Sequence, residues 1–281
     1  MASFKPNLLA GRTAIITGAS SGIGREVART MAAFGARVAL LARRRSELNL
    51  LADEIEYAGG IALPIPCDVT KPAELRPAAD YIMDELGVAD ILINSAGVAI
   101  PDRIYDARTE DLRMMMEVNY FGAVEVIRTF LPMMLNAGFG NIVNIGSTAG
   151  VRADETLAGY CASKFALAGY TEALRLELYG SGVTASLVMP GPVDTPMLQN
   201  PHWQSRATLL ANAVVPVNWV ASAVIAAVIY RLAQVDVPPG AGTALKLTTL
   251  FPDMTEPWYA LGSRVAEVFG FWARTNRIVG S

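Results

Sequence analysis

The chain has 281 residues, of which 52% are hydrophobic and 17% charged, enough for one large α/β domain or two small ones with a sizeable core. Its 23 lysines and arginines against 26 aspartates and glutamates give a formal net charge of −3, which excludes a strongly basic nucleic-acid-binding protein. Two distant cysteines, Cys67 and Cys161, and one histidine, His202, argue against a disulfide-stapled secreted fold and exclude a histidine-rich metal site. We therefore expect no metal and a reducing, cytoplasmic environment.

No segment predicts a membrane span. Met1–Leu9 lacks the apolar run of a signal peptide. The most apolar stretch, Trp219–Tyr230, ends at Arg231 before it reaches the roughly 20 residues that a bilayer crossing needs. We expect a soluble protein with no transmembrane segment, in which the high hydrophobic fraction serves a large core or an oligomer.

Apolar runs typical of strands alternate with helical patterns from residue 13 to about 249. Strands are predicted at Thr13–Thr17, Arg37–Leu41, Ile61–Pro66, Asp90–Asn94, Asn141–Gly146, Thr184–Met189 and Thr243–Thr249. Helices are predicted from the first glycine turn through Phe34 and at Ser46–Tyr57, Pro72–Leu86, Thr109–Leu135, Leu157–Leu178 and Asn218–Gln234. Pro64 and Pro66 favour an edge position for the third strand. Pro132 is expected to bend or interrupt the long fourth helix.

Several predicted strands are almost wholly apolar, which indicates burial on both faces, as in a parallel sheet with helices on each side. No linker, repeat or low-complexity segment divides the alternation. The sequence therefore predicts an α/β fold over residues 1–250: a doubly wound parallel sheet, or Rossmann fold, of about seven strands. Residues 251–281 are expected to form an aromatic-rich extension, helical near Trp258–Arg274. It lacks a strongly basic face, so we favour packing on its own domain or a partner subunit over a lipid surface.

Three glycines, Gly18, Gly22 and Gly24, lie directly between the first predicted strand and the first predicted helix. Glycine lets the backbone turn tightly and lets a pyrophosphate approach closely. The free N–H groups of the helix start then favour the anion. In this context the turn predicts dinucleotide binding rather than a turn needed for packing alone.

The residues after the second predicted strand favour one nicotinamide dinucleotide over the other. An acidic side chain there would bind the ribose 2′-hydroxyl, whereas arginine suits a 2′-phosphate. This chain has Arg43, Arg44 and Arg45, and its first carboxylate is Glu47. A guanidinium can donate two hydrogen bonds to one phosphate, so the sequence predicts a preference for NADP(H) through Arg43 and Arg44. The alternative is a solvated basic turn at a helix start.

Tyr160 and Lys164 are four residues apart in a predicted helix and therefore share a face. A free tyrosine has a pKa of about 10, and a fixed ammonium group nearby would lower that pKa. The pair would then form a general acid–base group. Ser147 follows the fifth predicted strand, at the end of the sheet where ligands bind in open α/β folds. The alternative is an exposed pair of helix residues.

Taken together, these motifs make the chain resemble a classical short-chain dehydrogenase/reductase. The matching segments keep the family order and spacing over residues 13 to about 200: Thr17–Gly24, Cys67–Val69, Asn94–Gly97, Val118–Tyr120, Ser147, Tyr160–Lys164 and Pro190–Thr195. Two positions depart from the family pattern, which usually has asparagine at Ser95 and serine at Gly146. Neither departure touches an atom that the chemistry requires.

The resemblance implies that Tyr160 exchanges a proton with the substrate oxygen, to which Ser147 donates a hydrogen bond. It also implies that Lys164 lowers the Tyr160 pKa and holds the nicotinamide ribose, and that Asn119 holds a water linking Lys164 to solvent. Asp68 would flank the adenine. The implied cofactor-binding residues are Gly18, Ser20, Ser21, Ile23, Gly24, Arg43, Arg44, Asp68, Val69, Asn94, Ala96, Gly97, Tyr160, Lys164, Pro190, Gly191, Val193 and Thr195.

These implications predict an NADP(H)-dependent oxidoreductase that interconverts a small-molecule ketone and a secondary alcohol, with no nucleic-acid partner. One alternative is a reductase of a long-chain lipid or steroid-like ketone at a membrane surface. Another is a non-catalytic NADP-binding sensor or scaffold. The resemblance also implies a homodimer or homotetramer formed through helices near 109–135 and 157–178. A substrate lid near 192–216 would place His202 and Trp203 either against substrate or in a surface loop.

Overall fold

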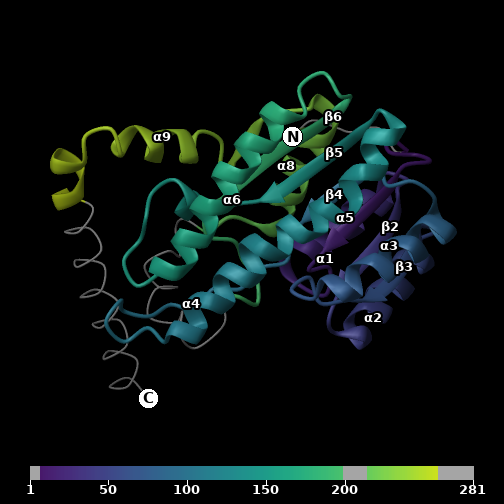
Figure 1. Ribbon diagram of the computed structural model, residues 1–281, viewed down its shortest axis with the longest axis horizontal. Coiled ribbons are helices and arrows are strands. Elements are labelled where there is room, and N and C mark those ends of the chain that lie inside the picture. The colour runs from purple at the N-terminus through teal and green to yellow at the C-terminus, as the bar shows by residue number, and fades with distance from the viewer. Residues whose placement is uncertain (1–6, 199–213, 259–281) are drawn as a thin grey trace, which may run out of the picture.

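Seven parallel strands form one sheet in the order β3-β2-β1-β4-β5-β6-β7 (Figure 1). The computed structural model describes residues 7–198 and 214–258. The strands are β1 (Thr13–Thr17), β2 (Arg37–Ala42), β3 (Ile61–Pro66), β4 (Ile91–Asn94), β5 (Gly140–Ile145), β6 (Val183–Pro190) and β7 (Gln234–Val237). The doubly wound fold predicted from the apolar strands is confirmed, and β3 lies at the edge, as its prolines predicted.

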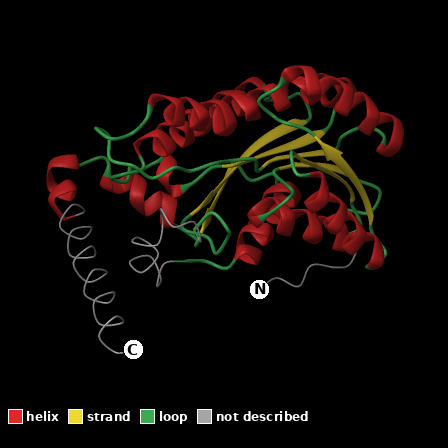
Figure 2. Cartoon of the chain, turned by 90° about the horizontal axis from the view of Figure 1, so that it is seen from below, coloured by secondary structure: helices red, strands yellow, loops and turns green. Residues whose placement is uncertain are grey.

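Helices cover both faces of the sheet (Figure 2). The described helices are α1 (Gly22–Ala33), α2 (Arg45–Tyr57), α3 (Pro72–Leu86), α4 (Thr109–Met116), α5 (Gly122–Ala137), α6 (Ala158–Glu177), α8 (Val217–Tyr230) and α9 (Ala241–Thr248). One core cluster joins α1, α2 and α8 to one face of the sheet. A second joins α3, α5 and α6 to the other. Neighbouring residues of β1 enter opposite clusters, Ile15 one and Ile16 the other, because side chains alternate along a strand.

The strand order reverses beside β1, which pairs with β2 on one side and β4 on the other. From β1 the chain continues to β2 and β3, toward one edge of the sheet, whereas from β4 it continues to β5, β6 and β7, toward the other edge. The connections after β1 and after β4 therefore leave in opposite directions. This opens a crevice at the carboxyl ends of the strands, where open α/β sheets bind ligands.

The predicted seventh strand at Thr243–Thr249 is wrong, because these residues form α9. The seventh strand is β7, of which only Gln234 had been predicted, as the last residue of a helix. That helix, α8, ends at Tyr230 because Arg231 adopts a left-handed conformation, with φ 51° and ψ 43°. The chain then turns back and pairs in parallel with β6, so the free edge of β6 is already occupied before residue 243.

The long fourth helix is interrupted, but not at Pro132. The interruption is a π-helical turn at Glu117–Phe121, between α4 and α5. Pro132 lies inside α5, which continues to Ala137 and ends at the left-handed Gly138. Residues on either side of the proline, Phe130 and Met134, are fully buried in the core, and this packing holds the helix together across the proline.

Among the helices that the structure describes, none combines the length and apolar character that a bilayer crossing requires. His202 and Trp203 of the expected lid, and most of the helix expected near Trp258–Arg274, lie outside the described residues. Residues 252–258 are helical.

Candidate active site

A cavity of about 380 Å³ lies at the carboxyl ends of the strands. It brings together all the predicted site residues except Asn94 and Asn119. Those that line it are Gly18, Ser20, Ser21, Ile23, Gly24, Arg43, Arg44, Asp68, Val69, Ala96, Gly97, Ser147, Tyr160, Lys164, Pro190, Gly191, Val193 and Thr195. Segments spread over most of the chain therefore converge on one space.

The glycine turn between β1 and α1 fits a bound anion. Gly18 has φ +69°, and a Cβ built on it would meet the backbone of Ala96 at 2.8 Å. A Cβ on Gly24 would collide with the carbonyl oxygen of Gly18. α1 begins at the cavity wall with Ser21 as its N-cap, and the Ser21 side chain makes no capping hydrogen bond. The first N–H groups of α1 are therefore not satisfied by that side chain, which suits a phosphate.

The carboxyl end of β2 contributes two arginines to the same cavity. Arg44 Nη2 donates a hydrogen bond to Ser20 Oγ at 3.0 Å, which joins the end of β2 to the glycine turn. Asp68 lines the same cavity. Burial tends to raise the pKa of Asp68, but hydrogen bonds from Thr70 and the charges of Arg43 and Lys71 outweigh burial and lower that pKa. This end of the cavity thus combines two guanidinium groups with one stabilised carboxylate.

Thr17, the last residue of β1, fixes the loop after β4. Its Oγ1 accepts hydrogen bonds from the backbone N–H groups of Ser95 at 3.0 Å and Ala96 at 3.2 Å. Ser95 and Ala96 are held in this way against the glycine turn, where both line the cavity. The serine that replaces the family's usual asparagine makes this backbone contact without using its side chain.

Asn94 is buried within the sheet and does not line the cavity. Its Nδ2 donates to Asn144 Oδ1 at 2.8 Å, and Asn144 Nδ2 donates to Thr171 Oγ1 at 2.8 Å. This polar chain ties β4 and β5 to α6. The structure thus places Asn94 where it supports the sheet below the site.

Asn119 lies on the π-helical turn between α4 and α5, a type of irregularity often found at functional sites. Its side chain accepts from the Val98 N–H at 2.8 Å and donates to the Val98 oxygen at 2.9 Å and to Ser163 Oγ at 2.8 Å. Ser163 Oγ in turn donates to the backbone oxygen of Tyr160 at 2.7 Å. Asn119 therefore connects the loop after β4 to the turn of α6 that carries Tyr160.

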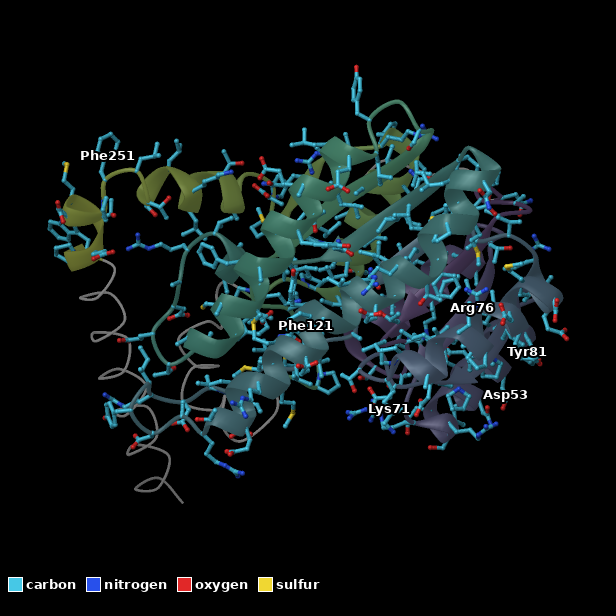
Figure 3. The ribbon with its side chains drawn as sticks, in the orientation of Figure 1. Asp53, Lys71, Arg76, Tyr81, Phe121 and Phe251 are labelled. Atoms are coloured by element: carbon cyan, nitrogen blue, oxygen red, sulfur yellow. The ribbon has the colours of Figure 1, made fainter. Side chains whose placement is uncertain are left out.

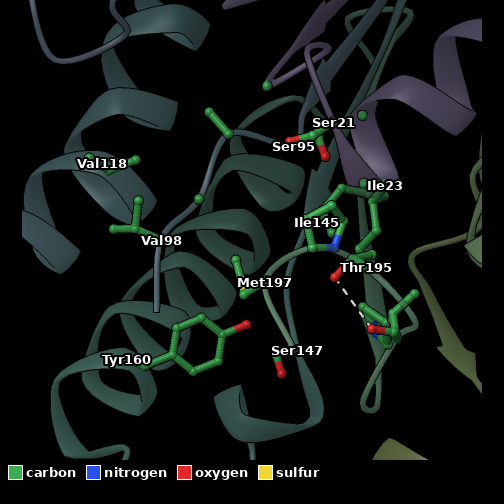
Figure 4. A pocket seen from close by; sticks show the side chains of 18 of the residues that line it. Ser21, Ile23, Ser95, Val98, Val118, Ile145, Ser147, Tyr160, Thr195 and Met197 are labelled. Carbon is green, nitrogen blue, oxygen red and sulfur yellow. Dashed lines mark hydrogen bonds between the residues drawn. The ribbon is translucent and has the colours of Figure 1, made fainter. Parts of the chain in front are cut away.

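The three side chains expected to handle the proton lie on adjacent elements. Ser147 follows β5, and its Oγ accepts from the Ala149 N–H at 3.1 Å. Tyr160 and Lys164 both belong to α6. Figure 4 shows the Tyr160 hydroxyl pointing into the cavity between Ser147 and Met197. The Lys164 side chain is buried, and its Nζ donates to the backbone oxygen of Ile145 at 2.8 Å.

Burial controls the ionisation of this pair. It raises the pKa of Tyr160 to about 12, against a hydrogen bond with Ser147 that lowers it. Burial also lowers the pKa of Lys164 to about 8. The expected lowering of the Tyr160 pKa by Lys164 is not found in the protein itself. Desolvation is the largest influence on the Tyr160 pKa, and the Lys164 amine donates its hydrogen bond to Ile145.

The wall beside Tyr160 consists mainly of apolar side chains that sequence reasoning missed. Leu157 and Cys161 form a small core cluster, with Ala149, Tyr160 and Leu198 packed against it. Gly22 of the predicted glycine turn also lines the cavity, and the unpredicted lining residues of the whole cavity are Leu41, Ala42, Cys67, Ser95, Val98, Val118, Ile145, Gly146, Thr148, Ala149, Asp154, Leu157, Pro192, Pro196, Met197 and Leu198. Many flank a predicted motif, but others, such as Asp154, carry no local signal.

Comparison with known proteins agrees with this geometry. The sequence model of the short chain dehydrogenase family matches residues 12–205. The chain is 33% identical over 208 residues to an uncharacterized oxidoreductase of Staphylococcus epidermidis, covering 73% of this chain and 89% of the relative. It is 37% identical over 190 residues to the D-beta-hydroxybutyrate dehydrogenase of Rhizobium meliloti, covering 67% and 74%. It is also 37% identical over 186 residues to the ketoacyl reductase HetN of Nostoc sp., covering 66% and 65%.

Solved structures give the same result. A short chain dehydrogenase/reductase from Burkholderia phymatum in complex with NAD matches with a TM-score of 0.81 and 26% identity, over 88% of this chain and 96% of that one. The actinorhodin polyketide ketoreductase with NADPH matches with a TM-score of 0.77 and 32% identity, over 82% and 97%. The chain belongs to the classical short-chain dehydrogenase/reductase family. It is an oxidoreductase that acts on CH–OH groups, in a family that binds a nicotinamide cofactor.

Proposed function

We propose that the protein is an NADP(H)-dependent oxidoreductase that interconverts a ketone and a secondary alcohol, with Tyr160 as the acid–base group. One arrangement carries this proposal: the Tyr160 hydroxyl, Ser147 and Lys164 line the same cavity as the glycine turn at Gly18. A nucleotide bound along that turn would reach the tyrosine without leaving the cavity.

Arg43 and Arg44 support the choice of NADP(H). Both line the cavity where β2 ends, and Arg44 already bonds to Ser20 on the glycine turn. Two guanidinium groups at this end would bind a 2′-phosphate. When bound, the nicotinamide supplies or accepts the hydride at the carbonyl carbon.

The ionisation of Tyr160 suits the reductive direction. A pKa of about 12 keeps its hydroxyl protonated at neutral pH, and this is the form that donates a proton to a carbonyl oxygen. Ser147 Oγ would donate a hydrogen bond to the same oxygen as negative charge develops there. Lys164 would hold the nicotinamide ribose, and with Asn119 it would return a proton to Tyr160 through a water.

The test is a panel of ketones assayed by NADPH oxidation with the purified protein. Turnover of at least one ketone, with NADPH preferred over NADH, is the expected result. Tight NADPH binding without turnover of any ketone would instead favour the non-catalytic sensor or scaffold.

A second candidate is a reductase of long-chain ketones at a membrane surface. α9 and the helical residues 252–258 extend away from the sheet (Figures 1 and 2). Large apolar side chains are exposed along this arm, and Figure 3 shows Phe251 projecting from it. They are Leu247, Leu250, Phe251, Met254 and Trp258. One relative, the fatty acyl-CoA reductase of Acinetobacter baylyi, is 38% identical over 200 residues. Co-sedimentation with liposomes, which Leu250→Ser and Phe251→Ser together should abolish, tests this candidate.

We also propose a homo-oligomer that forms through α4, α5 and α6. Exposed apolar side chains lie along these elements and the turn between them: Met114, Phe121, Leu135 and Phe165. Figure 3 labels Phe121 on the surface of this layer. Light scattering on the full chain should give a dimer or tetramer mass, and Phe121→Glu with Phe165→Glu should shift it toward the monomer.

A further inference from the structure

The segment that follows β5 contacts Lys164 at two places. At its start, the backbone oxygen of Ile145 accepts a hydrogen bond from Lys164 Nζ at 2.8 Å. Further along, Gly150 lies against the backbone of the same lysine, since a Cβ built on Gly150 would be 2.8 Å from the Lys164 carbonyl oxygen and 3.0 Å from its carbonyl carbon. The segment is therefore held against α6 at both ends.

The constraint at Gly150 is close contact, not an unusual backbone conformation. Gly150 is buried, and its φ is not positive, so other residues could adopt the same backbone. The atoms that face it belong to the backbone of α6, which cannot rotate aside as the end of a flexible side chain can. Ordinary contact begins at 3.4 Å, so a methyl group at this position requires the turn and the helix to separate by about 0.6 Å.

Gly150 and Ser147 belong to one hydrogen-bonded turn. The Gly150 N–H donates to the backbone oxygen of Ser147 at 2.9 Å, and Ser147 Oγ accepts from the Ala149 N–H at 3.1 Å. Ser147 lines the cavity and makes a hydrogen bond with Tyr160, whereas Gly150 does not line the cavity. A displacement at Gly150 would therefore reach the site through Ser147.

We infer that Gly150 is a positioning residue, whose contact with the Lys164 backbone sets how far the Ser147 hydroxyl lies from Tyr160. The inference rests on the proposed function, in which Ser147 and Tyr160 contact the same substrate oxygen. A misplacement of about 1 Å in a catalytic site can cost on the order of a hundredfold in rate. A separation of about 0.6 Å is therefore expected to cost on the order of tenfold.

The first measurement compares Gly150→Ala with the wild-type chain in ketone reduction by NADPH. The variant should lower kcat on the order of tenfold and leave the dissociation constant of NADPH nearly unchanged, because Gly18 and the two arginines are not displaced. Gly169→Ala is the matched control, since Gly169 lies on α6 and a Cβ there would meet no neighbouring atom within 4 Å. It should change neither quantity.

A double-mutant cycle with Ser147→Ala separates positioning from general loss of stability. If Gly150 acts through the Ser147 hydroxyl, Gly150→Ala should lower kcat much less in the Ser147→Ala background than in the wild type. General destabilisation would lower kcat by the same factor in both backgrounds. Crystal structures of the wild type and Gly150→Ala give a readout that needs no turnover: the distance from Ser147 Oγ to the Tyr160 hydroxyl should be longer in the variant.

The other outcomes would overturn the inference. They are a wild-type kcat in Gly150→Ala, an equal loss in both backgrounds, or an unchanged distance between the two hydroxyls. A Gly150→Ala protein that does not fold would overturn it as well, because the glycine would then serve the fold as a whole. Absence of turnover of every ketone by the wild-type chain would count against the proposed function, while the comparison of distances would still decide the role of Gly150.

Discussion

The amine of Lys164 lies 5.7 Å from the ring centre of Tyr160 and donates its hydrogen bond to Ile145 instead of to the phenol. Lys164 is buried and Tyr160 is half-buried at the cavity wall; desolvation by the surrounding protein lowers the pKa of Lys164 to about 8 and raises that of Tyr160 to about 12. In the protein alone the Tyr160 hydroxyl is therefore protonated at neutral pH, and Lys164 is still mostly protonated at pH 7.

The lowered pKa of Lys164 makes the free energy of unfolding depend on pH. Its pKa is about 8 in the folded protein against an ordinary 10.5, so between these values the unfolded chain binds more protons and stability rises with pH. Below pH 8 the buried ammonium costs up to about 3 kcal/mol. Lys164→Met should therefore gain stability relative to wild type at pH 7, and this gain should shrink toward pH 10. Urea unfolding across this range measures it, and a difference that does not vary with pH would contradict the burial account.

The two arginines at the end of β2 should determine the choice of cofactor. Arg43→Ala and Arg44→Ala are each expected to lower the NADPH-to-NADH ratio of kcat/KM on the order of tenfold, because each removes a guanidinium from the 2′-phosphate end. Arg45→Ala is the matched control, since Arg45 is exposed on α2 and does not line the cavity. If all three variants behave alike, the arginines form only a solvated basic turn.

Ser163 couples the π-helical turn to the catalytic helix through its bonds to Asn119 and Tyr160. Ser163→Ala leaves the buried Asn119 amide without one acceptor, so we expect a loss of about 1–3 kcal/mol in the free energy of unfolding and a lower kcat. Ser222→Ala removes an exposed hydroxyl that donates to Asn218 and should change neither. Denaturant unfolding and steady-state kinetics test both variants, and equal effects would remove the coupling role.

Substitution of Gly18 tests why the turn requires glycine: because the backbone of Ala96 lies so close, or only because the backbone is left-handed there. Gly18→Ala would strain φ +69° and also drive a Cβ into Ala96. Gly59→Ala carries comparable strain at φ +85° but has no atom within 4 Å of its Cβ, so it should cost about 1–2 kcal/mol. We expect Gly18→Ala to be more destabilising and also to weaken NADPH binding, measured by fluorescence titration. Equal losses, with binding intact, would mean that only the backbone conformation matters.

Local patterns predicted the strands that are buried on both faces, such as β1 and β4, because a short apolar run bounded by turn residues has few other structures open to it. They failed at the end of the sheet, where the left-handed Arg231 ends α8 and lets Gln234–Val237 pair with β6. A local stretch of sequence reveals neither a positive φ at an arginine nor which edge of the sheet is still unpaired.

The candidate site was predictable where chemistry imposes a motif, as at Gly18, Ser147 and Tyr160. It was not predictable where the position of a lining residue depends on packing between segments that are distant in the sequence. Asp154 and Met197 enter the cavity through loops whose course is set by tertiary contacts. The pKa of Tyr160 likewise depends on how much protein surrounds the ring, which no spacing of residues reveals.

The central claim is that the Tyr160 hydroxyl moves the proton, and Tyr160→Phe tests it most directly. The measurement is kcat for ketone reduction together with the dissociation constant of NADPH, with Tyr170→Phe as control because that tyrosine lies on the same helix outside the cavity. The account predicts that Tyr160→Phe lowers kcat by a factor on the order of 10²–10⁴ and leaves NADPH affinity nearly unchanged, while Tyr170→Phe keeps both. A Tyr160→Phe protein that retains most of the wild-type rate would contradict it.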